Sequence, residues 1–169
     1  NDDTGGPYVV GVDWGKLEDF TVFTVIDTQS NNVVYVDRFN QIDYTIQVDR
    51  LRKLYERYRP HNIIAERNAM GEPIIESLQR EGLPVTPFTT TNASKQAAID
   101  GLQMAFEREE ISIPSEPVLI AELQAFEAQR LPSGMLRYSA PSGFHDDMVM
   151  SLALAWSGVS GNESRLLLW

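Results

Sequence analysis

The pattern of hydrophobic and polar positions near the N-terminus predicts three β-strands. Apolar runs rich in β-branched and aromatic residues cover residues 8–13, 19–27 and 33–39. Asn31 and Asn32 form a turn signal between the second and third runs. Because connections this short join antiparallel neighbours, we expect the three strands to form an antiparallel meander.

Beyond Asp43 the hydrophobic spacing is that of helices alternating with short strands. Pro60 ends the first helix, and Ser94 is a candidate cap for a later one. The other predicted helices cover residues 71–82, 94–110, 117–129 and 145–156, the predicted strands cover residues 62–66, 83–89 and 111–113, and residues 130–139 form a candidate hairpin. This order predicts an α/β fold. Its mixed sheet has three antiparallel strands and then parallel strands, with helices on both faces.

Length and composition predict one compact domain. The chain has 169 residues, of which 43% are hydrophobic and 22% charged. Residues 1–7 are expected to be a linker remnant, residues 8–158 the domain, and residues 159–169 a C-terminal tail. No apolar run approaches the roughly 20 residues of a membrane span, and the polar start is unlike a signal peptide, so we expect a cytoplasmic protein without a membrane partner. The absence of cysteine excludes disulfides and thiolate chemistry.

The charge balance argues against a general nucleic-acid binder. Lys and Arg number 14 against 24 acidic residues, which gives a net charge of -10. Phosphate contacts are usually made by clustered Lys and Arg. Either the protein does not bind nucleic acid, or it is a catalytic domain and another part of a larger protein binds the DNA.

Three acidic positions stand where a predicted strand or helix begins or ends. Asp13 ends the first strand, Glu66 ends the fourth, and Asp146 and Asp147 open the last helix. If the fourth strand pairs beside the first, Asp13 and Glu66 come close together, and a helix N-terminus against those strand ends adds Asp147. Gathered carboxylates repel each other unless divalent cations neutralise them, and oxygen ligands select Mg²⁺ or Mn²⁺. Two such ions would stabilise the attacking and leaving oxygens in phosphodiester hydrolysis.

Each acid also has an interpretation without a metal. Asp13 fits a turn that includes Gly15. Glu66 and Arg67 fit an exposed ion pair at a strand end. An acid at the start of the last helix fits a cap, which the helix dipole favours. Each acid alone is weak evidence for a metal site, but their placement on separate elements favours one shared site.

One histidine and several basic residues are candidates for contacts around such a site. His145 fits either a group that orients a metal-bound water or a structural histidine. Lys16 follows the first strand and could face the cleaved DNA strand, and Lys95 fits either a phosphate contact or a solvated side chain. Arg130 and Arg137 flank the turn of the candidate hairpin. That hairpin could contact a phosphate, block the duplex until it moves, or be an ordinary surface hairpin.

Three blocks of sequence resemble the nuclease domain of the large terminase subunit of tailed bacteriophages, which has an RNase H-like fold. They are GVDWGKLEDFTVFTVID at residues 11–27, NIIAERNAMGEPIIESL at residues 62–78 and GFHDDMVMSLALAW at residues 143–156. The resemblance runs over nearly the whole chain. The third block is the most specific, because its Gly-aromatic-His-Asp-Asp run leads into an apolar helix.

The resemblance implies a metal-dependent endonuclease that cuts concatemeric viral DNA during genome packaging. It implies that Asp13, Glu66 and the pair Asp146 and Asp147 bind the metals, with Asp147 favoured as the closer ligand. The expected partners are double-stranded DNA, the N-terminal packaging ATPase domain of the same subunit, the portal protein and the small terminase. The implied location is the cytoplasm of the infected bacterial host.

Other interpretations stay open at this point. The packaging ATPase would need a Walker sequence, and residues 11–16 are one residue short of one, with Leu17 in place of Ser or Thr. The chain is therefore expected to be a domain fragment. A junction resolvase of the same fold and a non-catalytic RNase H-like scaffold are the alternatives. A proofreading exonuclease is disfavoured because Gly15 replaces the second acid of its Asp-x-Glu pair.

Overall fold

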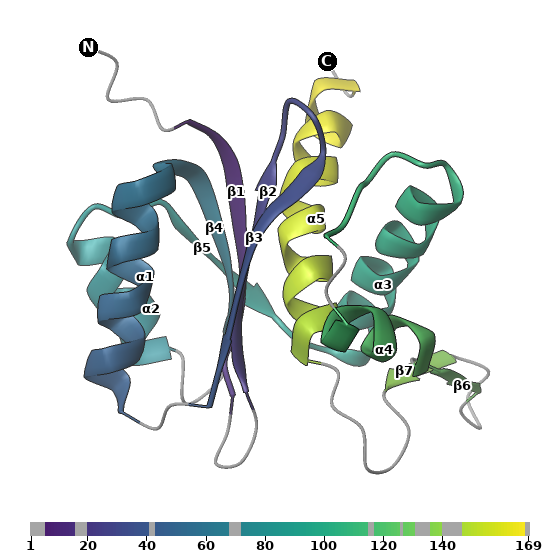
Figure 1. The fold of residues 1–169 in the computed structure, drawn as a ribbon, viewed down its shortest axis with the longest axis horizontal. Coiled ribbons are helices and arrows are strands. Elements are labelled where there is room, and N and C mark those ends of the chain that lie inside the picture. Colours follow the sequence, from purple (N-terminus) through teal and green to yellow (C-terminus); the bar gives the residue numbers. More distant parts are fainter. Residues whose placement is uncertain are drawn as a thin grey trace.

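A five-stranded mixed sheet lies at the centre of the computed structural model (Figure 1). The structure describes residues 6–15, 20–40, 43–67, 72–114, 117–125, 127–130, 136–139 and 147–167, with the backbone alone for residues 6, 118, 124–125, 127–130, 136–139, 147 and 160–167. The strands are β1 (Gly6–Asp13), β2 (Thr21–Asp27), β3 (Asn32–Phe39), β4 (Pro60–Arg67) and β5 (Val85–Thr89).

The strand order is β3-β2-β1-β4-β5. β3, β2 and β1 are antiparallel neighbours, whereas β4 pairs parallel with β1 and β5 pairs parallel with β4. The mixed sheet predicted from the sequence is therefore confirmed. The parallel pairing has a consequence for the site, because β1 and β4 end at the same edge of the sheet.

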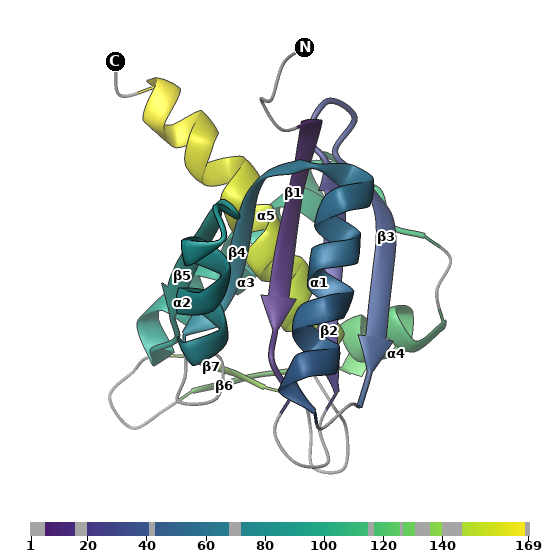
Figure 2. The ribbon, with the colours of Figure 1, turned by 90° about the vertical axis from the view of Figure 1, so that its left-hand side faces the viewer.

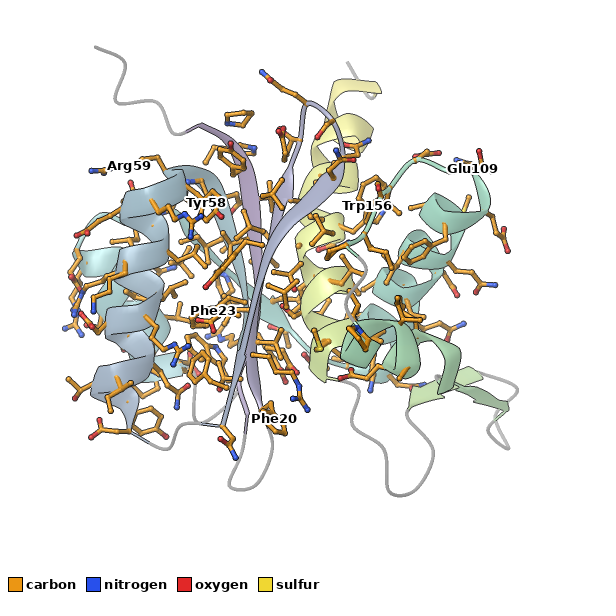
Figure 3. The ribbon with its side chains drawn as sticks, viewed as in Figure 1. Phe20, Phe23, Tyr58, Arg59, Glu109 and Trp156 are labelled. Carbon is orange, nitrogen blue, oxygen red and sulfur yellow. The ribbon has the colours of Figure 1, made fainter. Side chains whose placement is uncertain are left out.

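Helices cover both faces of the sheet, as predicted, and Figures 1 and 2 show the two layers. α1 (Tyr44–Tyr58) and α2 (Glu72–Arg80) lie on one face, and α3 (Asn92–Glu107), α4 (Pro117–Ala125) and α5 (Asp147–Leu167) lie on the other. Each face has its own hydrophobic core. Phe23 packs in the core under α1 and α2, and Trp156 packs in the core of α3 and α5 (Figure 3).

Local sequence signals set several helix ends. The Asp43 side chain accepts a hydrogen bond from Thr45 N at 2.8 Å and caps α1. α1 ends at Tyr58, before Pro60, as the sequence predicts. The expected Ser cap of α3 was misplaced. Thr91 is the N-cap, and Ser94 completes a capping box from the third helical position.

Other boundaries differ from the sequence-based expectations. Residues 111–113 form no strand, because Ser112 makes only an isolated bridge to Asn32. β1 begins at Gly6 and α5 continues to Leu167, so both extend into the segments expected to be linker and tail. The hairpin is present as β6 (Glu127–Arg130) and β7 (Leu136–Ser139), and α4 is correspondingly shorter than expected. Among the helices described, none is both long enough and apolar enough to cross a membrane.

Candidate active site

Asp13 and Glu66 lie at the ends of two neighbouring parallel strands. The register of β1 and β4 pairs Val12 with Ala65, so Asp13 and Glu66 occupy the next position on each strand. Neighbouring strands are about 4.8 Å apart. The two acids are therefore side by side at one edge of the sheet, as expected if the fourth strand pairs beside the first.

Both acids belong to the face of the sheet that α5 covers. Side chains alternate along a strand, so Asp13 shares its face with Val9, and Glu66 shares its face with Ile64. A Cβ added to Gly158 of α5 would lie 2.8 Å from Val9 Cγ1 and 3.0 Å from Ile64 Cγ1, which places α5 on this face. Asp13 is only 8% exposed, and Glu66 is half-buried.

α5 packs directly on β1 because both elements carry small residues where they meet. A Cβ added to Gly11 would lie 2.1 Å from Ser151 O and 2.4 Å from Ala155 N, both backbone atoms of α5. The Ser151 hydroxyl lies 2.8 Å from Gly11 O and 3.0 Å from Val22 O, and these two carbonyls share its single hydrogen. The Thr24 hydroxyl is 2.8 Å from the same Ser151 oxygen. This buried polar contact fixes where α5 lies along β1.

The start of α5 therefore lies close to the level of Asp13. α5 runs opposite to β1, since its residue 158 meets Val9 whereas Ser151 meets Gly11. From Ser151 back to Asp147 is one helical turn, about 6 Å. From Gly11 on to Asp13 is two strand residues, about 6.6 Å. Figures 1 and 2 agree, because in both views the first turn of α5 lies near the end of β1.

A buried glutamate caps that first turn. Glu122, on α4, is 6% exposed, and its Oε1 accepts hydrogen bonds from Met148 N at 3.0 Å and from Val149 N at 3.4 Å. These amides belong to the first helical turn, where backbone N–H groups have no partner within the helix. A carboxylate at this end is also favoured by the helix dipole. Glu122 thus links α4 to the start of α5 and fixes the position of that first turn.

Hydrogen bonds on the α1 side of the sheet fix the residues immediately after Asp13. Gly15 N donates to Thr21 Oγ1 at 2.9 Å, and Thr21 Oγ1 donates to Gln47 Oε1 at 3.1 Å. Thr21 and Gln47 are each 1% exposed, so these hydrogen bonds are shielded from water. Trp14 is buried in the core under α1 and α2. Asp13 is therefore flanked by residues anchored in the opposite layer.

Arg67 pairs with Glu72 and not with Glu66, unlike the ion pair that the sequence also allowed. Arg67 Nη2 lies 2.9 Å from Glu72 Oε1, and Arg67 Nε donates to the same oxygen at 3.0 Å. Arg67 pairs with the first residue of α2, on the exposed surface. The charge of Arg67 is therefore neutralised by Glu72.

The remaining candidates are placed only in part. Lys95 lies in the first turns of α3, which follows β5 and so starts at the same edge of the sheet as Asp13. Arg130 and Arg137 belong to β6 and β7, of which the backbone alone is described. The candidates outside the described residues are Lys16, His145 and Asp146, and of Asp147 only the backbone is described. Among the described residues no group of three or more His, Cys, Asp or Glu could hold a metal ion.

Sequence reasoning missed three polar residues that position the acids. Glu122, Gln47 and Ser151 are buried on helices, and each makes a hydrogen bond next to Asp13 or the start of α5. A signal was present in two of them. Glu122 stands in the apolar run Pro117–Ala125, and Ser151 stands in the apolar first half of α5. Polar residues at such positions indicate a specific hydrogen-bond partner.

Comparison with known proteins gives a consistent result. Residues 10–157 match the family model described as the terminase RNaseH-like domain. The large terminase subunit of Thermus virus P23-45 is 34% identical over 157 residues, which are 92% of this chain and 32% of that protein. The chain thus spans about a third of the length of the curated relatives it matches.

Solved structures agree with the sequence matches. The large terminase nuclease from thermophilic phage G20c, in the form with bound magnesium, has a TM-score of 0.81 at 33% identity, covering 89% of this chain and 80% of that one. The HK97 bacteriophage large terminase shares the fold, with a TM-score of 0.74 at 12% identity over 93% of this chain and 40% of that one. These matches favour a terminase over a junction resolvase. The chain belongs to the terminase RNase H-like domain family, and its fold is that of large terminase nuclease domains.

Proposed function

We propose that the chain is the nuclease part of a large terminase subunit and that it hydrolyses phosphodiester bonds of double-stranded DNA with the help of divalent cations. One observation carries the proposal. Asp13 and Glu66 occupy neighbouring positions on one face of the sheet, at the edge where α5 begins. The family match supplies the class of reaction.

The residues fit hard divalent cations. Asp13 and Glu66 offer only carboxylate oxygens, and the chain has no cysteine that would select a softer metal. Asp147 is the proposed third ligand, with Asp146 as the alternative beside it. We propose Mg²⁺ or Mn²⁺ as the ions, two of them in the working site. The related G20c nuclease has been crystallised with magnesium, cobalt and zinc bound, which supports a divalent cation here.

The cations, when bound, would neutralise charge that develops on the phosphodiester oxygens. The residues of the chain do the positioning. β1 and β4 hold Asp13 and Glu66 at a fixed spacing, and the hydrogen bonds of Gly15 to Thr21 and of Met148 to Glu122 hold the segments beside them. Because Asp13 is buried, its charge interacts through a medium of low dielectric constant, which strengthens its attraction to a cation.

The biological setting is also a proposal. As part of a large terminase subunit, the chain would cut concatemeric viral DNA in the cytoplasm of the infected bacterium. It would act with a packaging ATPase domain, the portal protein and the small terminase. The net charge of -10 fits this arrangement, because a domain with few basic residues would leave most contacts with DNA phosphates to other parts of the packaging assembly. Contacts of His145, Lys16, Lys95, Arg130 and Arg137 with DNA or metal stay predictions.

Nicking of a supercoiled plasmid tests the proposal. We expect cleavage with Mn²⁺ and none with EDTA. Asp13→Asn and Glu66→Gln should each lower the rate about 100-fold or more, because each removes charge that the site needs. Glu76→Gln, which changes an acid on the exposed side of α2, is the matched control and should cleave normally.

Thermal unfolding gives a second, independent measurement. Mn²⁺ should raise the melting temperature of the wild type, because it binds only the folded protein. It should have little effect on Asp13→Asn, whose metal-free form should be more stable than the wild type because one repelling charge is gone. Wild-type nicking in either site variant would refute the assignment. A wild type that neither cuts nor responds to Mn²⁺ would support the non-catalytic scaffold instead.

A further inference from the structure

The sheet register places an arginine in the same row as the two acids. Asp13 on β1 is paired with Val22 on β2, and Val22 is paired with Arg38 on β3. Side chains at directly opposed positions of neighbouring strands point to the same face. Glu66, Asp13, Val22 and Arg38 therefore form one row across four strands, on the face that α5 covers.

The Arg38 guanidinium is held at the edge of the sheet where Asp13 lies. Its Cζ is 3.5 Å from the centroid of the Phe20 ring. Phe20 immediately precedes β2, and β2 begins at the edge where the antiparallel β1 ends. Figure 3 labels Phe20 at that edge. The contact holds the planar guanidinium over the Phe20 ring.

Four arginines form ion pairs in the described part of the chain, and Arg38 is not one of them. Arg50, Arg52, Arg67 and Arg108 each have an acidic partner within 4.0 Å, at distances of 2.8, 2.7, 2.9 and 3.7 Å. Within the described part of the chain, Arg38 Nε is buried and has no hydrogen-bond partner. Nε therefore ties the guanidinium to no acceptor among the described residues.

We propose that Arg38 binds a phosphate of the DNA strand that crosses the site, beside the phosphate held at the acids. Two strand spacings separate Arg38 from Asp13, about 10 Å between their backbones. This distance favours contact with a flanking phosphate over pairing with Asp13. Arginine suits the task because its planar N–H groups match phosphate oxygens. The choice of ligand rests on the proposed function, whereas the position of Arg38 does not.

The competing explanation is that the Arg38 side chain only covers Phe20 with its aliphatic stem. Arg38→Met separates the two roles, because methionine keeps apolar contact with the ring and removes the charge and the donors. Arg57→Met is the matched control. Arg57 also lies over aromatic rings, 5.0 Å from the centroid of Tyr58 and 5.4 Å from that of Tyr35, but it belongs to α1 in the opposite layer.

Binding of a short fluorescein-labelled duplex, followed by anisotropy in EDTA at low salt, tests the phosphate contact without cleavage. We expect Arg38→Met to bind about tenfold more weakly than the wild type. The slope of log K against log salt should become shallower by about 0.9, the value for one phosphate contact. Arg38→Lys should restore most of the slope, because it restores the charge. Arg57→Met should change neither quantity.

Plasmid cleavage with Mn²⁺ then checks the role in turnover. Arg38→Met should raise KM with kcat nearly unchanged, and the rise of melting temperature with Mn²⁺ should stay as in the wild type. Equal affinity and slope in Arg38→Met and the wild type, or an equal loss in Arg57→Met, would overturn the proposal. So would a wild type that binds no duplex at low salt. If the wild type binds but never cuts, the nuclease proposal fails while the Arg38 result still decides the phosphate contact.

Discussion

Replacing Gly11 by alanine is expected to push α5 away from β1. A Cβ at this position would lie 2.1 Å from Ser151 O, 2.4 Å from Ala155 N and 2.9 Å from Ala155 Cβ. The two shortest contacts are with backbone atoms, so no change of side-chain rotamer relieves them. The two elements must separate by about 1 Å, and overpacking of this kind costs about 1–3 kcal/mol. We expect the upper end, about 3 kcal/mol, because the surrounding core is closely packed.

Urea unfolding and thermal unfolding measure this cost. For a domain of this size, 1 kcal/mol corresponds to about 2–4 °C in melting temperature, so Gly11→Ala should lower it by about 6–12 °C. The displacement should also move the first turn of α5 away from Asp13. We therefore expect a smaller rise in melting temperature with Mn²⁺ and slower nicking, measured at a temperature where the variant is fully folded.

Two other glycines supply a graded comparison. A Cβ at Gly158 would meet only side-chain atoms, Val9 Cγ1 at 2.8 Å and Ile64 Cγ1 at 3.0 Å, so Gly158→Ala should be milder. A Cβ at Gly101, inside α3, would meet nothing within 4 Å. Gly101→Ala should stabilise the protein by about 0.5–1 kcal/mol through helix propensity. If Gly11→Ala is as stable as the wild type, or less harmful than Gly158→Ala, the account of α5 packing is wrong.

Two further predictions concern hydrogen bonds of glutamates. Glu122→Leu should lower the free energy of unfolding by about 1–3 kcal/mol, because it leaves the amides of Met148 and Val149 without their acceptor. Glu122→Gln keeps an acceptor oxygen and should retain most of the wild-type stability. Equal urea midpoints for the two variants would contradict the role of Glu122 as a cap. The hydrogen bonds from Arg52 hold the pKa of Glu81 below its ordinary 4.5, so this pair stabilises the fold above that pH and loses its contribution as the pH falls through the lowered value. The difference in urea midpoint between wild type and Glu81→Gln should shrink over that acidic range, and a constant difference would argue against the pair.

Much of the sheet could be predicted because hydrophobic period and turn residues are local properties. The three antiparallel strands and the later parallel ones follow from runs of apolar residues and the short connections between them. Residues 111–113 form no strand because a strand needs a neighbour along its length, and here only Ser112 reaches Asn32. The end of α5 was also missed. Glycines and polar residues follow Trp156, yet the helix continues to Leu167.

Part of the candidate site could be predicted in the same way, and part could not. The acids at strand ends stand out because a charged residue closes an apolar run. Arg38 gives no such signal, because the sequence does not fix the register that aligns it with Val22 and Asp13. Glu122 stands out as an acid in an apolar run, but the sequence does not show what it caps, since its partners on α5 are 26 and 27 residues away.

The packing of α5 also gives small residues a part in the proposed site, beside the acids. The level of the α5 start relative to Asp13 depends on contact between Gly11 and the backbone at Ser151 and Ala155. A larger residue at any of these positions would act as a spacer between the helix and the strand. The distance between the acids on the sheet and the acid at the helix start is therefore set by packing well inside the molecule. Metal affinity should follow core substitutions along this contact more closely than substitutions on the exposed faces of α1 and α2.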